Sequence, residues 1–347
     1  VGKFTSPHIL RYNERILYNR QMIDDEEVVE NYFFLKQMIE NCKRENENLK
    51  DIYLNFFEIT TFIALMFFAK KNPDFLVIET GLGGRLDATN IINSDIALIT
   101  NITFDHTAIL GNSLKEIAYE KAGIIKNREL CIYADSLPEL EEEINKKTEN
   151  SLNIIKKYND MEIELDKTNY KTLIKFQNNE FILPLFGKFQ ANNFLLAYET
   201  AKFYNIDNET IQNGVNKVYW PARFEFFSVE PSVILDAAHN DDSIRKLIEN
   251  LTEIYKRNEV IIITSLLATK DFEKVFTKLE KITDKIFITS LKDTVNGLSS
   301  AEIREKMISL NIPVDGIIFD AKNAISRQFE KANFNRGTLD DIWQIKR

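Results

Sequence analysis

The chain has 347 residues, of which 44% are hydrophobic and 28% charged, and its formal net charge is −9. These values are ordinary for a folded protein of two domains, and the acidic balance without a basic stripe argues against nucleic-acid binding. Cys42 and Cys131 are too few for a disulfide framework or a zinc site. The longest apolar run, residues 59–69, is too short to span a bilayer, and no signal segment opens the chain, so we expect a cytoplasmic protein.

The first half of the sequence predicts helices that alternate with strands. Acidic residues crowd the start of the first predicted helix, as the helix dipole favours, and short apolar runs that end in polar residues predict buried strands. A charged, Asn-rich segment with short alternating stretches predicts antiparallel hairpins. These elements are helices over residues 24–42 and 56–70, strands over 75–79, 96–100 and 130–134, and hairpins within 139–180.

The most informative stretch is residues 76–90, LVIETGLGGRLDATN. Its strand ends in Glu79, and three glycines follow, which allow tight backbone turns. Ligands bind at the carboxyl ends of strands in open α/β sheets, so we interpret this stretch as a binding site. The alternative is a solvated loop held by a structural pair between Arg85 and Asp87.

Two further polar residues follow predicted secondary structure in the first half. His106 comes after the strand over residues 96–100, and parallel strands would bring it to the same sheet edge as Glu79. A hydrogen-bonded structural histidine is the alternative. A capping box of Ser113 and Glu116 begins a helix that a C′ residue, Gly123, ends. Lys121 then lies in the last turn, where a lysine commonly satisfies helix carbonyls.

From residue 232 onward, strands and helices alternate regularly, which predicts a second parallel α/β domain. Asp236, His239 and Asn240 lie where the first of these strands meets a helix, an arrangement that suits phosphate binding. We interpret residues 216–221 as the hinge and expect domains over residues 1–215 and 220–347. The predicted strands end at residues 236, 264, 289 and 319, and the predicted helices begin at residues 241, 271, 299 and 321.

A set of five ordered stretches carries a family resemblance. They are FTSPH (4–8), ETGLGGRLDATN (79–90), TNITFDHTAILG (100–111) with EKAGIIK (120–126), GKFQANN (187–193), and WPARFE (220–225) with DAAHN (236–240). Together they resemble the folylpolyglutamate synthase/dihydrofolate synthase family of the Mur ligase group, from residue 1 to about residue 320. The string GLGGRLDATN is specific for this family rather than for the cell-wall ligases.

The resemblance implies an α/β protein in which a parallel-sheet ATPase domain, similar to P-loop NTPases, precedes a smaller Rossmann-like domain. It also implies an ATP-dependent ligase that joins L-glutamate to the carboxylate of a folate or a dihydropteroate through an acyl phosphate. Two Mg²⁺ ions would assist, since ATP phosphates need charge neutralisation. The implied partners are small molecules, without nucleic acid or membrane, and the family is usually monomeric.

The resemblance also assigns roles in the first domain. Ser6 and Glu79 would hold the magnesium ion that bridges the ATP phosphates. His106 would hold the second ion. Lys121 matches a lysine that carbon dioxide carbamylates, which turns its ammonium into a carboxylate-like group able to help hold that ion. His106 and Lys121, with His239, are the expected catalytic residues.

In the second domain, the resemblance assigns ATP contacts. Arg223 would bind phosphate as a bidentate donor, Asp236 would bind ribose hydroxyls, and Asn193 would lie near adenine. His239 and Asn240 complete the motif.

The sequence also departs from the family. No G-x-x-x-x-G-K-[ST] phosphate loop occurs, so we expect that the sequence starts partway through a gene product, without the first strand of the sheet, and that the chain as given is inactive or nearly so. Ala222 and Ala237 stand where glycine is common, and residues 332–347 keep only a faint Gly-Thr-Leu echo of the family's end.

The missing loop leaves two alternative functions open. One is a non-catalytic remnant that binds a folate or a nucleotide. The other is a related Mur-type amide ligase with a different acceptor. The choice between dihydropteroate and a reduced folate as acceptor also stays open.

Overall fold

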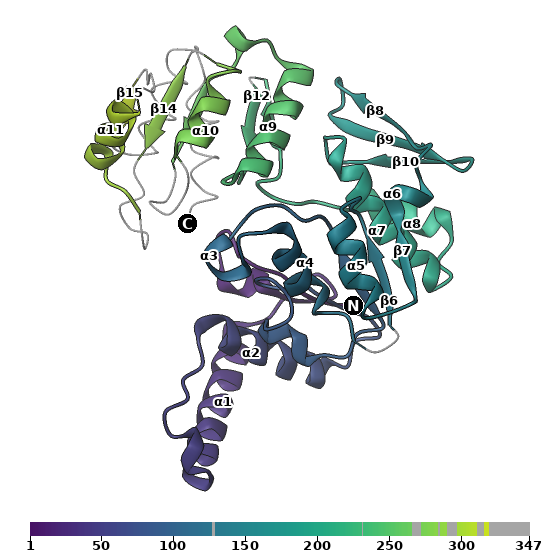
Figure 1. Ribbon diagram of the computed structural model, residues 1–347, viewed down its shortest axis with the longest axis vertical. Helices are drawn as coiled ribbons and strands as arrows, with labels where there is room; N and C mark the ends of the chain where they lie inside the picture. Colours follow the sequence, from purple (N-terminus) through teal and green to yellow (C-terminus); the bar gives the residue numbers. More distant parts are fainter. Residues whose placement is uncertain are drawn as a thin grey trace. The chain divides into compact units, whose positions relative to one another are not determined.

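Figure 1 shows the computed structural model of the chain. The residues it describes are 1–126, 129–230, 232–265, 272–283, 285–289, 297–310 and 316–318. Contacts divide the described residues into two compact units, one made of residues 1–131 and 135–152, the other of residues 132–134 and the described residues from Asn153 to Ile318. None of the described helices has both the length and the apolar character that a bilayer crossing requires.

A four-stranded sheet with the order β3-β2-β1-β4 organises the first unit. β1 runs parallel to β4 and antiparallel to β2, with Phe4 opposite Ile78. This register places Thr5 and Glu79 at the same end of neighbouring strands, because each directly follows its strand. The strands are β1 (Gly2–Phe4), β2 (Ile16–Tyr18), β3 (Gln21–Met22) and β4 (Leu76–Ile78).

Two long helices, α1 (Asp25–Glu45) and α2 (Phe56–Lys71), confirm the helices predicted for this unit. They lie side by side in Figure 1. An Asn55–Glu58 capping box begins α2, and Asn72 ends it in left-handed conformation, with φ 46°. α2 packs its apolar side chains on the sheet, and the resulting core includes Phe4, Ile16 and Phe67. Two 3₁₀ helices, η1 (Tyr12–Arg15) and η2 (Glu47–Leu49), flank these elements.

Two expectations about the strands before Glu79 and His106 are wrong. β4 is a strand, but the side chains of Leu76 and Val77 are 39% and 56% exposed rather than buried. The cause is that β4 is an edge strand among the described strands of its sheet. The strand before His106, β5 (Ile96–Ile99), belongs to a different sheet with the order β5-β6-β7. Glu79 and His106 therefore do not share one edge of a single described sheet.

Further helices and strands follow in the chain between β4 and residue 157. The predicted strand before residue 134 is confirmed as β6, and the predicted helix after Ser113 is confirmed as α4. Residues 138–145 and 154–157 form helices where we expected hairpins. For the first of these helices, Pro138 at the first helical position and the acidic residues behind it favour a helix start. The elements are η3 (Ala88–Ile91), α3 (Thr107–Leu110), α4 (Leu114–Ala122), β6 (Leu130–Tyr133), α5 (Pro138–Asn145), β7 (Ser151–Asn153) and α6 (Ile154–Lys157).

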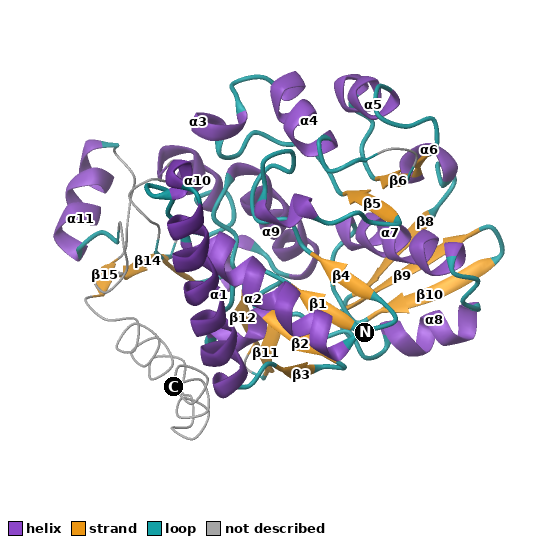
Figure 2. Ribbon diagram, turned by 90° about the horizontal axis from the view of Figure 1, so that it is seen from below, coloured by secondary structure: helices purple, strands orange, loops and turns teal. Residues whose placement is uncertain are grey.

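An antiparallel sheet with the order β10-β9-β8 begins the larger part of the second unit. It confirms the hairpins predicted between residues 161 and 183. Apolar side chains alternate along β9, so one face is buried against α7. Figure 2 shows β8, β9 and β10 as adjacent strands beside α7 and α8. The elements are β8 (Glu162–Asp166), β9 (Lys171–Phe176), β10 (Asn179–Leu183), α7 (Phe189–Phe203) and α8 (Asn208–Val215).

A parallel sheet with the order β13-β14-β15 follows and confirms the predicted α/β rhythm. β12, which we expected in this sheet, instead pairs antiparallel with β11. The helix predicted from residue 321 and the segment 332–347 lie outside the described residues. The elements are β11 (Glu225–Val229), β12 (Ser232–Leu235), α9 (Asp241–Ile254), η4 (Arg257–Glu259), β13 (Ile262–Thr264), α10 (Phe272–Leu279), β14 (Ile286–Thr289), α11 (Ser300–Ser309) and β15 (Gly316–Ile318).

The core of this last region packs α9, α10 and α11 against the parallel strands. Ile244, Phe276, Ile288 and Ile303 are each 3% exposed or less. Burying side chains of this size contributes roughly 1.5–3 kcal/mol each. The α/β class predicted from the sequence is therefore confirmed in both units.

Candidate active site

Ser6 and Glu79 meet at the ends of β1 and β4. The backbone N–H of Ser6 donates to Glu79 Oε2 at 2.8 Å, and the backbone N–H of Glu79 donates to the carbonyl of Phe4 at 2.9 Å. The Ser6–Pro7 peptide bond is cis. The parallel register of the two strands thus brings together a carboxylate and a hydroxyl-bearing residue that are 73 positions apart in the sequence.

The loop that follows Ser6 is held by charged residues that the sequence analysis missed. The Glu14 carboxylate accepts hydrogen bonds from the backbone N–H groups of Ile9, Leu10 and Arg11 at 2.7–2.9 Å. Arg15, which is only 8% exposed, donates its Nε–H to His8 Nδ1 at 2.7 Å. The available signal was the pair Glu14-Arg15 directly before an apolar strand. Charged side chains beside a buried strand lose part of their solvation, so they must form hydrogen bonds within the neighbouring loop.

The His8–Arg15 hydrogen bond predicts a pH-dependent stability. Burial, and then the charge of Arg15, lower the pKa of His8 from its ordinary value of 6.5, with Glu14 opposing. The contribution of His8 is therefore complete above about pH 6.5 and is lost as the pH falls through the lowered folded-state pKa. We expect the urea midpoint to fall between pH 7 and pH 5, and to fall less in His8→Gln. If the urea midpoint fell equally in wild type and His8→Gln between these pH values, the pH dependence would not come from His8.

The glycine-rich loop is held both to the end of α4 and by hydrogen bonds among its own residues. Arg85 donates from Nε and Nη2 to Glu120 Oε1 at 3.1 and 2.9 Å, and its backbone N–H donates to the Glu120 carbonyl at 2.8 Å. Asp87, which we considered as the partner of Arg85, instead accepts from the backbone N–H groups of Gly81 and Leu82. The polar residues of the loop therefore do hold its structure. Arg85 and Asp87, however, do not pair with each other, as the alternative interpretation had supposed.

His106 and Lys121 lie near a common carboxylate, Asp105. His106 has a left-handed backbone with φ 51° directly before α3, and its Nε2 lies 3.8 Å from Asp105 Oδ1. Lys121 is half-buried in the last turn of α4, as predicted. Burial lowers the pKa of Lys121, and the charge of Asp105 partly opposes this shift. A lysine with a lowered pKa carries a larger fraction of neutral, nucleophilic amine.

Gly123 ends α4 for a different reason from the one predicted. Its φ is −63°, so it is not a left-handed C′ residue. A Cβ placed on Gly123 would lie 2.3 Å from Arg85 Cβ and 2.6 Å from Arg85 Cα. Glycine is required there by close approach of the loop backbone, not by helix-end geometry.

In the second unit, Asp236 holds a backbone turn around Arg223. Its Oδ2 accepts from the Phe224 N–H at 2.8 Å, and its Oδ1 accepts from the Ala238 N–H at 2.7 Å. Arg223 is exposed and attracts Asp236 electrostatically. The structure therefore brings together Arg223 and Asp236, which the sequence placed in separate motifs.

His239 and Asn240 form the start of α9. Asn240 is its N-cap, and its Oδ1 accepts from the Ser243 N–H at 2.9 Å. His239 is exposed, with Nδ1 at 2.9 Å from the Ala237 carbonyl. The hydroxyl of Ser243, which the sequence analysis missed, accepts from the backbone N–H groups of His239 and Asn240 and donates to Asn240 Oδ1 at 2.7 Å. Its signal was the three-residue spacing of a capping box.

Ala222 adopts a conformation that favours glycine, because its φ is 55°. An alanine in the left-handed region costs about 1–2 kcal/mol, partly offset by its lower entropy in the unfolded chain. We therefore expect Ala222→Gly to raise the free energy of unfolding by about 0.5–1 kcal/mol, measured by urea denaturation. The matched variant Ala237→Gly, whose φ is not positive, should not stabilise the protein. A stability gain in Ala237→Gly but not in Ala222→Gly would contradict the backbone argument.

Asn193 lies within α7 and not at its start. It is exposed, and its Nδ2 donates to the Oε1 of Gln190, one turn earlier, at 3.0 Å. The N-cap of α7 is Lys188. Asn193 is thus oriented by a buried neighbour, Gln190, that the sequence analysis did not single out.

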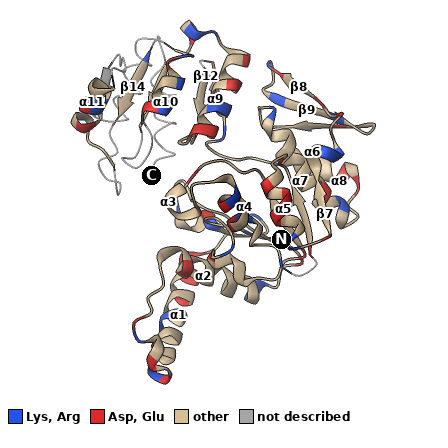
Figure 3. Ribbon diagram, in the orientation of Figure 1, with Lys and Arg blue, Asp and Glu red and all other residues tan. Residues whose placement is uncertain are grey.

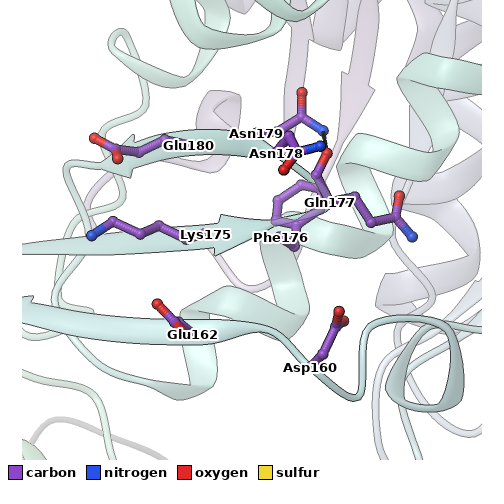
Figure 4. A pocket seen from close by; sticks show the side chains of 8 residues that line it. All are labelled: Asp160, Glu162, Lys175, Phe176, Gln177, Asn178, Asn179 and Glu180. Atoms are coloured by element: carbon purple, nitrogen blue, oxygen red, sulfur yellow. Dashed lines mark hydrogen bonds between the residues drawn. The ribbon is translucent and has the colours of Figure 1, made fainter.

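A depression of about 390 Å³ involves none of the predicted site residues. It is an open depression on the β8–β9–β10 hairpins, and Figure 4 shows Glu162, Lys175 and Glu180 extending from three neighbouring strands along it. Lys175 pairs with Glu164 at 3.2 Å. The depression lacks the buried, convergent polar groups of a small-molecule site, so we treat it as surface.

Charge is mixed over the described surface. Figure 3 shows basic and acidic residues interspersed along the helices, with acidic residues gathered on α5. Within the described ranges, no group of three or more His, Cys, Asp or Glu side chains is arranged to hold a metal ion.

Comparisons with known proteins give a consistent family. The Mur ligase middle domain matches residues 30–201, and the Mur ligase glutamate ligase domain matches residues 222–337. The dihydrofolate synthase/folylpolyglutamate synthase of Bacillus subtilis is 32% identical over 305 residues, which are 84% of this chain and 70% of that protein. The folylpolyglutamate synthase of Lacticaseibacillus casei is 28% identical over 314 residues, 87% of this chain and 72% of that protein.

A solved structure agrees with these sequence matches. The folylpolyglutamate synthase of Mycobacterium tuberculosis, solved in complex with ADP and AMPPCP, superposes with a TM-score of 0.83 at 25% identity. The match covers 96% of this chain and 78% of that one. These sequence and structure matches agree with each other, and they show that the chain belongs to the dihydrofolate synthase/folylpolyglutamate synthase family of Mur ligases.

Proposed function

We propose that the protein is an ATP-dependent ligase that adds L-glutamate to the carboxylate of a folate or a dihydropteroate. ATP would first convert that carboxylate to an acyl phosphate, and the amine of glutamate would then displace phosphate. Family membership carries the proposal. The Ser6–Glu79 contact supports it, because it provides a carboxylate at the carboxyl end of parallel strands.

The donors at this position suit magnesium that arrives with a nucleotide. Mg²⁺ prefers oxygen ligands, keeps several waters, and is commonly held by one or two carboxylates together with substrate phosphates. Glu79 and Ser6 supply one carboxylate and one hydroxyl, and the described residues contain no complete protein cage. Magnesium would neutralise the developing charge on the phosphates. Ser6 and Glu79 would hold the first ion.

Lys121 and His106 would serve the second ion. An ammonium would repel a cation, so Lys121 fits this role only after carbamylation, which burial favours by lowering the pKa of the amine. Its carbamate would then resemble a carboxylate beside His106 and Asp105. Lys121 and His106 are the proposed catalytic groups of the first unit.

The second unit would bind the nucleotide. Arg223 would contact phosphate, since its guanidinium is exposed and its neighbour Asp236 fixes the turn. Asp236 would accept from ribose hydroxyls, and Asn193 would contact adenine. His239 and Asn240 at the start of α9 complete this proposal, with His239 as a catalytic residue, although Asn240 also serves as the helix cap.

Coupled release of ADP from the full-length protein tests the proposal. The assay supplies ATP, magnesium, glutamate, and either dihydropteroate or tetrahydrofolate. We expect turnover that requires glutamate and at least one of these acceptors, which also identifies the acceptor. Glutamate-independent turnover would contradict the proposal. A folded protein that binds nucleotide without turnover would favour the non-catalytic remnant, and turnover with only a nucleotide-linked peptide would favour another Mur-type ligase.

Three accompanying predictions rest on the family resemblance. The protein would act as a monomer in the cytoplasm, on small molecules only. Size-exclusion chromatography with light scattering tests the first of these.

A further inference from the structure

The glycine loop and the end of α4 are joined by hydrogen bonds at three places. Arg85 binds Glu120 through side chain and backbone. Asn90 Nδ2 donates to the Gly123 carbonyl at 3.1 Å, and Lys126 Nζ donates to the Ile92 carbonyl at 2.5 Å. The bonds flank Lys121 on both sides in the sequence. We refer to the loop 81–92 and the segment 120–126, held together in this way, as the clamp.

Two adjacent glycines, Gly83 and Gly84, bring the loop against α3, which follows His106, and against the end of α4, which contains Lys121. A Cβ on Gly83 would lie 2.7 Å from Leu110 in α3, the helix that His106 precedes. A Cβ on Gly84 would lie 2.8 Å from the carbonyl oxygen of Glu120 and 3.0 Å from that of Lys121. Backbone atoms cannot move aside as a flexible side chain can, so the loop touches the backbone of Lys121 directly.

The ion pair at the centre of the clamp is partly shielded. The side chains of Arg85 and Glu120 are 35% and 18% exposed, and the Arg85 guanidinium also lies over the Tyr119 ring, 5.3 Å from its centroid. Both donors of Arg85 converge on one carboxylate oxygen. Such a pair fixes direction as well as distance, and it fixes the residue immediately before Lys121.

We propose that Arg85 and Glu120 are positioning residues, and that the clamp holds Lys121 and His106 in the geometry that the ligase reaction needs. The proposal rests on the proposed function of Lys121 and His106 and deepens it. The loop GLGGRLDATN thus contributes to the reaction by fixing α3 through Gly83 and the end of α4 through Gly84 and its polar residues, and not by touching substrate; Figure 1 shows α3 and α4 side by side.

A charge exchange tests the proposal in the full-length protein. Arg85→Glu and Glu120→Arg should each lower kcat by about 10–100-fold, the usual effect of residues that orient a metal ligand, with less than threefold change in the KM for ATP. The double variant R85E/E120R should recover at least a third of the wild-type kcat. The matched control is the Lys71–Glu27 pair, also 2.9 Å long and similarly exposed, whose charge reversals should leave kcat within twofold.

Two measurements that do not depend on turnover separate this proposal from the proposed function. With ¹³C-bicarbonate, NMR should show a carbamate signal in wild type that Lys121→Ala removes and that the single variants weaken. Hydrogen exchange of the Arg85 amide, which donates to the Glu120 carbonyl, should accelerate in the single variants and return to the wild-type rate in the double. Unchanged exchange and kcat in the single variants would overturn the clamp. Faster exchange in the single variants, together with a wild type that never turns over, would retain the clamp and reject the ligase.

A glycine variant gives an independent test. Gly84→Ala should lower kcat by at least about 10-fold, because its Cβ would lie 2.8 Å from the carbonyl oxygen of Glu120 and 3.0 Å from that of Lys121, and must displace the backbone next to Lys121. The control is Gly214→Ala in α8, where a Cβ meets no atom within 4 Å and kcat should not change. Wild-type kcat in Gly84→Ala, at unchanged Tm, would overturn the proposal.

Discussion

Glu79→Gln is expected to lower kcat by about 100–1,000-fold, or about 2.7–4 kcal/mol of transition-state stabilisation. The substitution preserves size, and the amide oxygen of glutamine can still accept the hydrogen bond from the Ser6 N–H. The fold should therefore persist, while the negative charge that would hold a metal-bound nucleotide is lost. Steady-state release of ADP over a range of magnesium concentrations measures the effect, and the magnesium requirement should rise.

The matched control is Glu47→Gln, which changes an exposed carboxylate in η2 that pairs only with its neighbour Lys50 among the described residues. Its kcat should stay within twofold of wild type. If Glu79→Gln kept wild-type activity and magnesium dependence, the proposed first metal site would be wrong.

Lys121→Ala should lower kcat by about 100-fold or more, because it removes the group proposed to become a carbamate. The change in stability distinguishes this role from the structural alternative. If Lys121 only satisfied helix carbonyls, its loss would cost about 0.3–1 kcal/mol of folding free energy and leave kcat nearly unchanged. With the proposed role, kcat falls while the urea midpoint stays the same or rises, because a half-buried amine is removed.

Lys115→Ala provides the comparison on the same helix. Lys115 is exposed and lies 3.8 Å from Glu142 on α5, a weak surface pair. Its kcat should match wild type. Acetate added to Lys121→Ala should restore part of the activity, since it can supply a carboxylate in the vacated space. A drop in stability with intact activity would return Lys121 to the role of a helix cap.

Much of the site could be located from the sequence because local signals mark where strands and helices end. Apolar runs that stop at Glu79 and before Asp236 predicted two strand ends, and both are confirmed as β4 and β12. The Ser113–Glu116 capping box placed Lys121 in the last turn of α4. These signals depend on neighbours within about four residues, so the sequence contains them completely.

Partner choice over long sequence separations could not be predicted. Arg85 had an acidic residue two positions away, Asp87, yet it pairs with Glu120, 35 positions away. Likewise, β12 pairs with β11 and not with the parallel strands that follow it. Such pairings depend on which backbone groups approach each other in three dimensions, and residue spacing does not determine this.

The sequence alone determined the α/β class, the order of most elements and, through the motifs, the family. The tertiary structure decided how individual residues are used. Gly123 is needed for close approach to Arg85 rather than for a left-handed turn. Leu76 and Val77 are exposed because β4 is an edge strand among those described. The physical reason is that hydrophobic periodicity and helix capping act locally, whereas burial and ion pairing are set by elements that only folding brings together.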